Sequence, residues 1–145
     1  MPTIRDLLRR KGGGIVSVSP TTSVLEAAQL MNARSTGSVV VLDGEGLRGI
    51  FSERDVLRRV VAGQRDPATT TVAQVMTSEL VTCSPDDSIA ACTAVMTRRR
   101  IRRLPVLDGG GALMGVVTSG DVLAWQVADQ ADVIEHLNTY IHDYH

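Results

Sequence analysis

The sequence predicts an α+β fold in which two β-α-β-β-α units pack as a pseudo-twofold pair. The first observation is a repeat within the 145 residues, since the segment starting at Val16 aligns at a constant offset with the segment starting at Val81. The second is that both copies show the same order of strand and helix patterns. The third is size, because a unit of about sixty residues buries too little surface to be stable alone. We therefore expect one folding body.

Each unit starts with a short predicted strand, at residues 16–18 and 81–83, followed by Ser-Pro and a helix. One face of each helix is apolar, with positions recurring at i, i+3, i+4 and i+7. These positions are Val24, Ala27, Ala28 and Met31 in the first copy and Ile89, Cys92, Thr93 and Met96 in the second. Candidate N-caps are Ser19, Ser23, Ser84 and Ser88, because a serine side chain accepts hydrogen bonds from first-turn amides.

A predicted β-hairpin follows in each unit. The β-branched runs at residues 38–42 and 104–107 are joined by Gly-rich turns to second strands at residues 47–51 and 113–117. A final helix is expected to start near Ser52 in the first copy and near Thr118 in the second.

Four segments are expected along the chain. They are a first unit with its N-terminal helix (1–63), a polar linker (64–70), a second unit (71–126) and a C-terminal helix (127–145). In the last segment an apolar stripe indicates either intramolecular packing anchored by Trp125 or a dimer interface. The stripe contains Val127, Ile134, Leu137 and Ile141, with Tyr140 and Tyr144 beside it.

Composition excludes several classes of function. The formal net charge is −1 and aromatic residues make up 3%, which disfavours nucleic-acid and base-stacking proteins. No apolar run approaches the roughly 20 residues of a membrane span, and no signal peptide is visible, so we expect a cytoplasmic protein without a membrane partner. No nucleotide-binding P-loop or catalytic constellation is present, so we expect no enzyme activity.

No metal site is expected either. Cys83 and Cys92 form no CxxC pair and are predicted to be reduced, buried thiols. His136, His142 and His145 lack zinc-ligand spacing and are predicted to form a solvated tail.

The motifs taken together resemble a known family. The segments RIRRLPVLD, GALMGVVTSGDVL and LRGIFSERDVL, with the Ser-Pro helix start in both copies, resemble a pair of cystathionine-β-synthase (CBS) domains over about residues 1–126. The likeness is greatest to small stand-alone bacterial pairs. It implies a homodimer that binds AMP, ATP or NAD(H) in the clefts between its units and regulates a separate protein.

The resemblance also implies the ligand-binding residues. The aspartate of each [ST]-x-x-D motif would hold the ribose and the Ser or Thr would lie near phosphate, which selects Ser52, Asp55, Thr118 and Asp121. Backbone groups of the stretch that precedes each motif in the chain would hold adenine, which selects Gly37, Ser38 and Val39, and Arg102, Arg103, Leu104 and Pro105. The implied set is completed by Ser17, Thr36, Arg54, Thr82, Arg100 and Gly120. The same Ser/Thr–Asp spacing is also typical of helix capping without any ligand.

An arginine cluster allows three interpretations. Arg98, Arg99, Arg100, Arg102 and Arg103 can face solvent at a helix end, reach the phosphates of a ligand, or bind a nucleic-acid backbone. The leading hypothesis is an adenine-nucleotide sensor. The alternatives are a protein–protein scaffold with empty clefts and a nucleic-acid-associated protein that uses this cluster.

Overall fold

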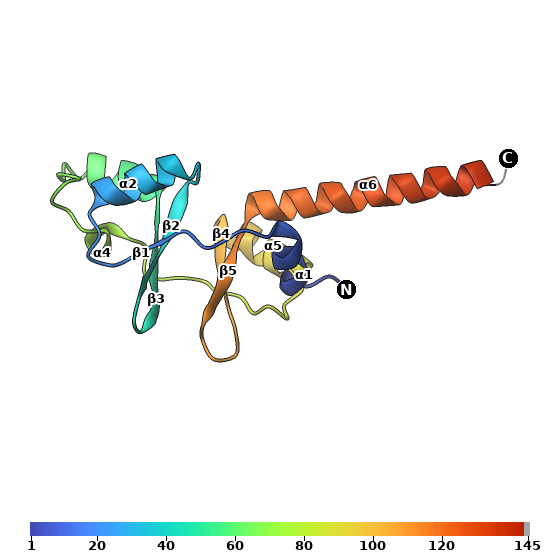
Figure 1. The fold of residues 1–145 in the computed structure, drawn as a ribbon, viewed down its shortest axis with the longest axis horizontal. Coiled ribbons are helices and arrows are strands. Elements are labelled where there is room, and N and C mark those ends of the chain that lie inside the picture. Colours follow the sequence, from blue (N-terminus) through green and yellow to red (C-terminus); the bar gives the residue numbers. More distant parts are fainter. Residues whose placement is uncertain (144–145) are drawn as a thin grey trace.

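Two similar α/β halves lie side by side, and a long C-terminal helix projects from one of them (Figure 1). The computed structural model describes the backbone of residues 1–143 and the side chains of all of these except 132, 133, 136 and 138–143. The elements in chain order are α1 (Ile4–Lys11), β1 (Ser17–Val18), α2 (Val24–Ala33), β2 (Ser38–Asp43), β3 (Gly46–Ser52), α3 (Glu53–Asp55), η1 (Val56–Val61), α4 (Val72–Val75), α5 (Ile89–Arg99), β4 (Arg103–Leu107), β5 (Leu113–Thr118) and α6 (Ser119–Asp143). The predicted α+β pair is confirmed.

The first half contains a three-stranded sheet. β1 pairs in parallel with β2, and β2 pairs antiparallel with β3. Helix α2 starts at Ser23, whose side chain accepts a hydrogen bond from the Glu26 amide at 3.1 Å. It buries Val24 against the sheet residues Val41 and Phe51, as the apolar spacing predicts.

The second half has a two-stranded sheet of β4 and β5, and helix α5 is capped by Ser88. Ser23 and Ser88 are therefore the helix caps, whereas Ser19 and Ser84 lie before them. The strand predicted at residues 81–83 is wrong, because only a single parallel bridge joins Cys83 to Val106. In the first half the Val40 amide donates to the Val16 carbonyl at 3.0 Å. The aligned residue in the second half is Pro105, which has no N–H to donate, so this ladder cannot extend.

The helix that precedes each repeat in the chain, α1 or α4, packs into the core of the other half; we call this the crossing of the leading helices. Ile4 and Leu7 of α1 are buried in the core of the second half, and the Ile4 amide donates to the Asp87 carbonyl at 2.9 Å. Val72 of α4 is buried in the core of the first half, and its amide donates to the Thr22 carbonyl at 2.8 Å. The expected first unit of residues 1–63 thus includes a helix that packs on the second unit in space. The segment boundaries themselves stay a prediction.

The helices that close the two units differ. In the first unit α3 passes directly into the π-helix η1, whereas in the second α6 runs from Ser119 to Asp143 without a break at residue 127. Leu123, Val127, Ile134 and Leu137 of α6 are all more than half exposed. The predicted contributions of Ile141, Tyr140, Tyr144 and the three histidines concern side chains that lie outside those the structure describes. Within the described chain, no helix combines the length and apolar character needed to cross a membrane.

Candidate functional site

Two cavities combine elements of both repeats. Cavity 1 has a volume of about 250 Å³ and cavity 2 of about 330 Å³. Each cavity is lined by residues at the start of a strand of one repeat and by residues at the start of a helix of the other. Thr36 and Ser38 of the first repeat face Thr118 of the second across cavity 1, and Ser52 of the first faces Arg102 of the second in cavity 2. This reciprocity follows from the pseudo-twofold packing.

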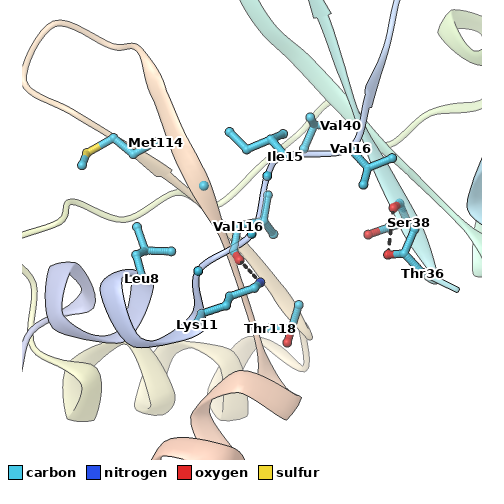
Figure 2. A pocket seen from close by; sticks show the side chains of 14 residues that line it. Leu8, Lys11, Ile15, Val16, Thr36, Ser38, Val40, Met114, Val116 and Thr118 are labelled. Carbon is cyan, nitrogen blue, oxygen red and sulfur yellow. Dashed lines mark hydrogen bonds between the residues drawn. The ribbon is translucent and has the colours of Figure 1, made fainter. Parts of the chain in front are cut away.

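Cavity 1 is lined by uncharged side chains and one lysine (Figure 2). Its walls are Leu8, Lys11, Gly12, Gly13, Gly14, Ile15, Val16, Thr36, Ser38, Val40, Met114, Gly115, Val116 and Thr118. Figure 2 shows the Lys11 side chain reaching from the end of α1 to β5. Gly12 and Gly13 have positive φ, and this glycine turn carries the chain from α1 along the cavity wall.

The Thr118–Asp121 motif caps α6 beside cavity 1. The Thr118 amide donates to Oδ2 of Asp121 at 2.9 Å, and the Asp121 amide donates to Oγ1 of Thr118 at 3.1 Å. The same Oδ2 accepts from Nζ of Lys11 at 2.7 Å, while Lys11 also donates to the Val116 carbonyl at 2.8 Å. Asp121 does not line cavity 1 itself, but it is bound by Lys11, which does.

Cavity 2 is strongly charged. Its walls are Ile50, Ser52, Glu53, Arg54, Asp55, Thr77, Glu79, Leu80, Val81, Arg100, Ile101, Arg102 and Arg103. Four guanidinium groups therefore line one cavity with three carboxylates. The positive charges of this lining outnumber the negative ones, so the cavity suits an anion. Phosphate fits such a site, because guanidinium groups bind phosphate oxygens through paired hydrogen bonds.

The arginine cluster is divided by the end of α5. Arg100 adopts a left-handed conformation with φ of 55°, so the chain changes direction at this residue. Arg98 and Arg99 are exposed on the helix, and Arg100, Arg102 and Arg103 line cavity 2, where Arg100 and Arg102 are also exposed and Arg103 is half-buried. The cavity brings Arg100, Arg102 and Arg103 within reach of a ligand there, and their contact with phosphate stays a prediction.

Asp55 is the buried acid of cavity 2, at 5% exposure. Its Oδ2 accepts from the Ser52 amide at 2.9 Å and from the Ser52 hydroxyl at 3.2 Å, which completes a capping box. Its Oδ1 accepts from the Thr77 hydroxyl at 3.2 Å and lies 3.7 Å from Nε of Arg59. An ionised carboxylate offers about four acceptor positions, and Ser52 and Thr77 fill three of them, so capacity for one ligand hydroxyl remains.

The structure divides the predicted ligand residues into three groups. Thr36, Ser38 and Thr118 line cavity 1, and Ser52, Arg54, Asp55, Arg100, Arg102 and Arg103 line cavity 2. The remaining residues, Ser17, Gly37, Val39, Thr82, Leu104, Pro105, Gly120 and Asp121, line neither cavity. Val39 and Leu104 are 1% exposed because alternate strand residues point into the cores.

Several lining residues were missed from the sequence. Lys11, Glu53, Thr77 and Glu79 are the polar ones. A sequence signal existed for Lys11 and Glu79. Residues 3–8 (TIRDLL) align with residues 71–76 (TVAQVM), and extending this alignment places Lys11 opposite Glu79. Both residues lie where the leading segment of a repeat enters a cavity.

Other polar clusters offer less chemistry. The described residues contain no group of three or more His, Cys, Asp or Glu side chains positioned to hold a metal ion. Cys83 and Cys92 are both buried free thiols, as predicted. Burial raises the pKa of the Cys83 thiol to about 12 and raises that of Cys92 as well, so neither is suited to act as a nucleophile.

Comparison with known proteins gives a consistent result. The CBS domain family matches the chain at residues 4–62 and 72–128. The CBS domain-containing protein YhcV of Bacillus subtilis is 32% identical over 131 residues, which cover 90% of each chain. The structure of a putative signal-transduction protein with CBS domains from Burkholderia ambifaria is 37% identical with a TM-score of 0.82, covering 88% of this chain and 96% of that one.

A more distant structure shares the fold. It is that of CBSX2 in complex with AMP, which is 23% identical with a TM-score of 0.76 and covers 90% of this chain and 99% of that chain. At 23% identity this likeness shows a shared fold alone.

Proposed function

The chain belongs to the CBS-domain family, and on that premise we propose that it is a cytoplasmic regulatory module that binds an adenine nucleotide between its two repeats and modulates a separate protein. The observation that carries the proposal is cavity 2. It brings one buried carboxylate, Asp55, together with four arginines from both repeats. The proposal covers AMP, ATP and NAD(H), which share the adenosine and phosphate groups that this cavity would bind.

Ribose binding is assigned to Asp55. A ribose presents two adjacent hydroxyl donors, and Asp55 keeps one acceptor position for one of them beside the three filled by Ser52 and Thr77. The capping box fixes this carboxylate through Ser52, so the acceptor is already oriented before a ligand arrives. Such preorganisation lowers the entropic cost of binding.

Phosphate binding is assigned to the arginines. Arg54 follows Ser52 in the first turn of the helix start, while Arg100, Arg102 and Arg103 approach from the second repeat. A phosphate bound here would join the two repeats through one ligand. The volume of cavity 2, about 330 Å³, falls within the range of about 300–1,000 Å³ that is usual for small-molecule pockets.

Regulation requires that ligand binding change a surface that another protein contacts. The ligand can shift the arrangement of the repeats only by its difference in affinity for the two arrangements.

We propose that the exposed apolar residues of α6, Leu123, Val127, Ile134 and Leu137, pair with a second copy of the chain. Sedimentation of the wild type and of Val127→Glu should show a dimer for the first and a monomer for the second, and equal masses would contradict the pairing.

A thermal-shift panel with AMP, ADP, ATP, NAD⁺ and NADH tests the proposed ligand class. A ligand at a hundred times its Kd stabilises the folded state by about 2.7 kcal/mol, a shift of several degrees for a domain of this size. Asp55→Asn should lose the shift, while Asp129→Asn, which changes an exposed carboxylate on α6, should keep it. No shift with any ligand, in folded protein, would favour a scaffold with empty clefts.

A further inference from the structure

Lys11 is the only lysine in the sequence, and it makes the two cavities chemically different. Its ammonium group lies 2.7 Å from Oδ2 of Asp121 and 2.8 Å from the Val116 carbonyl oxygen. Asp121 is the residue of the second repeat that corresponds to Asp55. The acceptor that a ribose would need at cavity 1 is therefore already bound by a cation of the protein itself.

The aspartate of cavity 2 is also paired with a cation, but this is Arg59 four residues along the same helical segment, and it lies farther away than Lys11 lies from Asp121. The residue aligned with Lys11 is Glu79, which lines cavity 2 and carries the opposite charge. Asp55 there accepts from the neutral hydroxyl of Thr77 and lies 3.7 Å from Arg59 of its own helix. The proposed ribose-binding carboxylate is thus bound closely by Lys11 at cavity 1, at 2.7 Å, and paired more loosely with Arg59 at cavity 2, at 3.7 Å.

The helix that carries Lys11 is anchored in the second half, while the Lys11 side chain is partly exposed. Ile4 and Leu7 anchor α1 in the second core, and the Arg10 guanidinium lies 3.8 Å from the centre of the Trp125 ring on α6. The side chains of Lys11 and Asp121 are 35% and 20% exposed, so the ion pair is partly accessible to water. Ion pairs of this kind are weak enough to be broken by a competing ligand.

We propose that Lys11 is a specificity-determining residue of cavity 1, where its ammonium group competes with ligand hydroxyl groups for Asp121. This inference rests on the proposed function, because it concerns ribose binding at the second of the two aspartates. It follows that cavity 2 fills first and that an adenosine ligand enters cavity 1 only as Lys11 releases Asp121. Removing the ammonium should strengthen binding at cavity 1 alone.

Isoleucine methyl NMR can follow both cavities in one titration. Ile15 lines cavity 1, whereas Ile50 and Ile101 line cavity 2. Adenosine is the probe, because it carries the ribose hydroxyls but no phosphate that Lys11 could attract. The variant Lys11→Met keeps an apolar stem of similar length and removes the charge.

In Lys11→Met the adenosine affinity reported by Ile15 should rise about two- to fivefold, in keeping with the strength of a partly exposed ion pair. The affinity reported by Ile50 and Ile101 should not change. The matched control Arg9→Met removes an exposed cation from the same last turn of α1 and should leave both affinities unchanged.

The outcomes separate this inference from the proposed function. Unchanged or weaker binding at Ile15 in Lys11→Met, or no response of Ile15 while Ile50 and Ile101 respond, would overturn the role of Lys11. No response at either cavity in any variant, with adenosine and with AMP, would overturn the proposed function itself. A second readout is the single Lys11 Nζ resonance, which should shift only when Ile15 responds.

Discussion

The hydroxyl of Thr77 donates a hydrogen bond to Oδ1 of Asp55 at 3.2 Å. This contact connects the segment leading into the second repeat with the helix start of the first. Thr77 is followed in the chain by Glu79, Leu80 and Val81, which line cavity 2. The same hydrogen bond thus orients the buried carboxylate and positions one wall of the cavity.

Replacement of Thr77 by valine removes this hydrogen bond and keeps the shape of the side chain. Because Asp55 is buried, the variant should lose about 1–3 kcal/mol of unfolding free energy, the usual cost of leaving a buried charged group short of a partner. Urea unfolding measures the loss. Thr69→Val, at an exposed position, is the control, and equal stabilities for the two variants would contradict the role assigned to Thr77.

The approach of α4 to β3 leaves no room for a side chain at Gly49. A Cβ atom there would lie 2.7 Å from the Thr77 carbonyl oxygen and 2.7 Å from Sδ of Met76. Gly49→Ala should therefore destabilise the protein by about 1–3 kcal/mol through overpacking. Gly44→Ala has open space around the new Cβ and should change the melting temperature little. A Gly49 variant as stable as the Gly44 variant would show that the wall beside Asp55 is loosely packed.

The two thiols should be unreactive in the folded protein. Burial raises the pKa of Cys83 to about 12, and the Cys83 thiol lies 3.7 Å from the Pro105 carbonyl oxygen. At pH 8 a disulfide reagent should therefore modify both cysteines far more slowly in the native state than in denaturant. Rapid modification of either thiol in native protein would contradict their burial.

The same pKa shift sets a dependence of stability on pH. The unfolded thiol releases its proton near its ordinary pKa of 9.0, whereas the folded thiol of Cys83 retains it until about pH 12. The contribution to stability is therefore fully present below pH 9 and is lost as the pH rises from 9 towards 12. Urea unfolding of Cys83→Ser should show a smaller decrease over this range than the wild type shows.

Much of the fold could be predicted from the sequence because each strand and helix pattern occurs in both copies of the repeat. The hairpins and the caps at Ser23 and Ser88 depend on local spacing, and both were predicted. The missing ladder at residues 81–83 depends on one proline, Pro105, which deletes a hydrogen-bond donor in the partner strand.

The crossing of the leading helices was not predictable from local patterns. TIRDLL and TVAQVM present similar apolar faces, so either core could accept either helix, and the choice depends on chain geometry between the halves. The predicted site identified Asp55 and the four arginines of cavity 2. It missed Lys11 and Glu79, because the repeat alignment pairs these two residues but only the crossing of the helices brings them to the cavities.

Calorimetric titration with AMP and adenosine, on Arg103→Ala and Arg98→Ala beside the wild type, tests the central claim most directly. Arg103 lines cavity 2, whereas Arg98 is an exposed cation of the same cluster. The account predicts saturable AMP binding that weakens about tenfold in Arg103→Ala, as expected for the loss of a charge-assisted hydrogen bond to phosphate. AMP binding should be unchanged in Arg98→Ala, and adenosine binding should be unchanged in both variants. Absence of saturable AMP binding by the wild type, or equal AMP affinities for Arg103→Ala and the wild type, would contradict nucleotide binding in cavity 2.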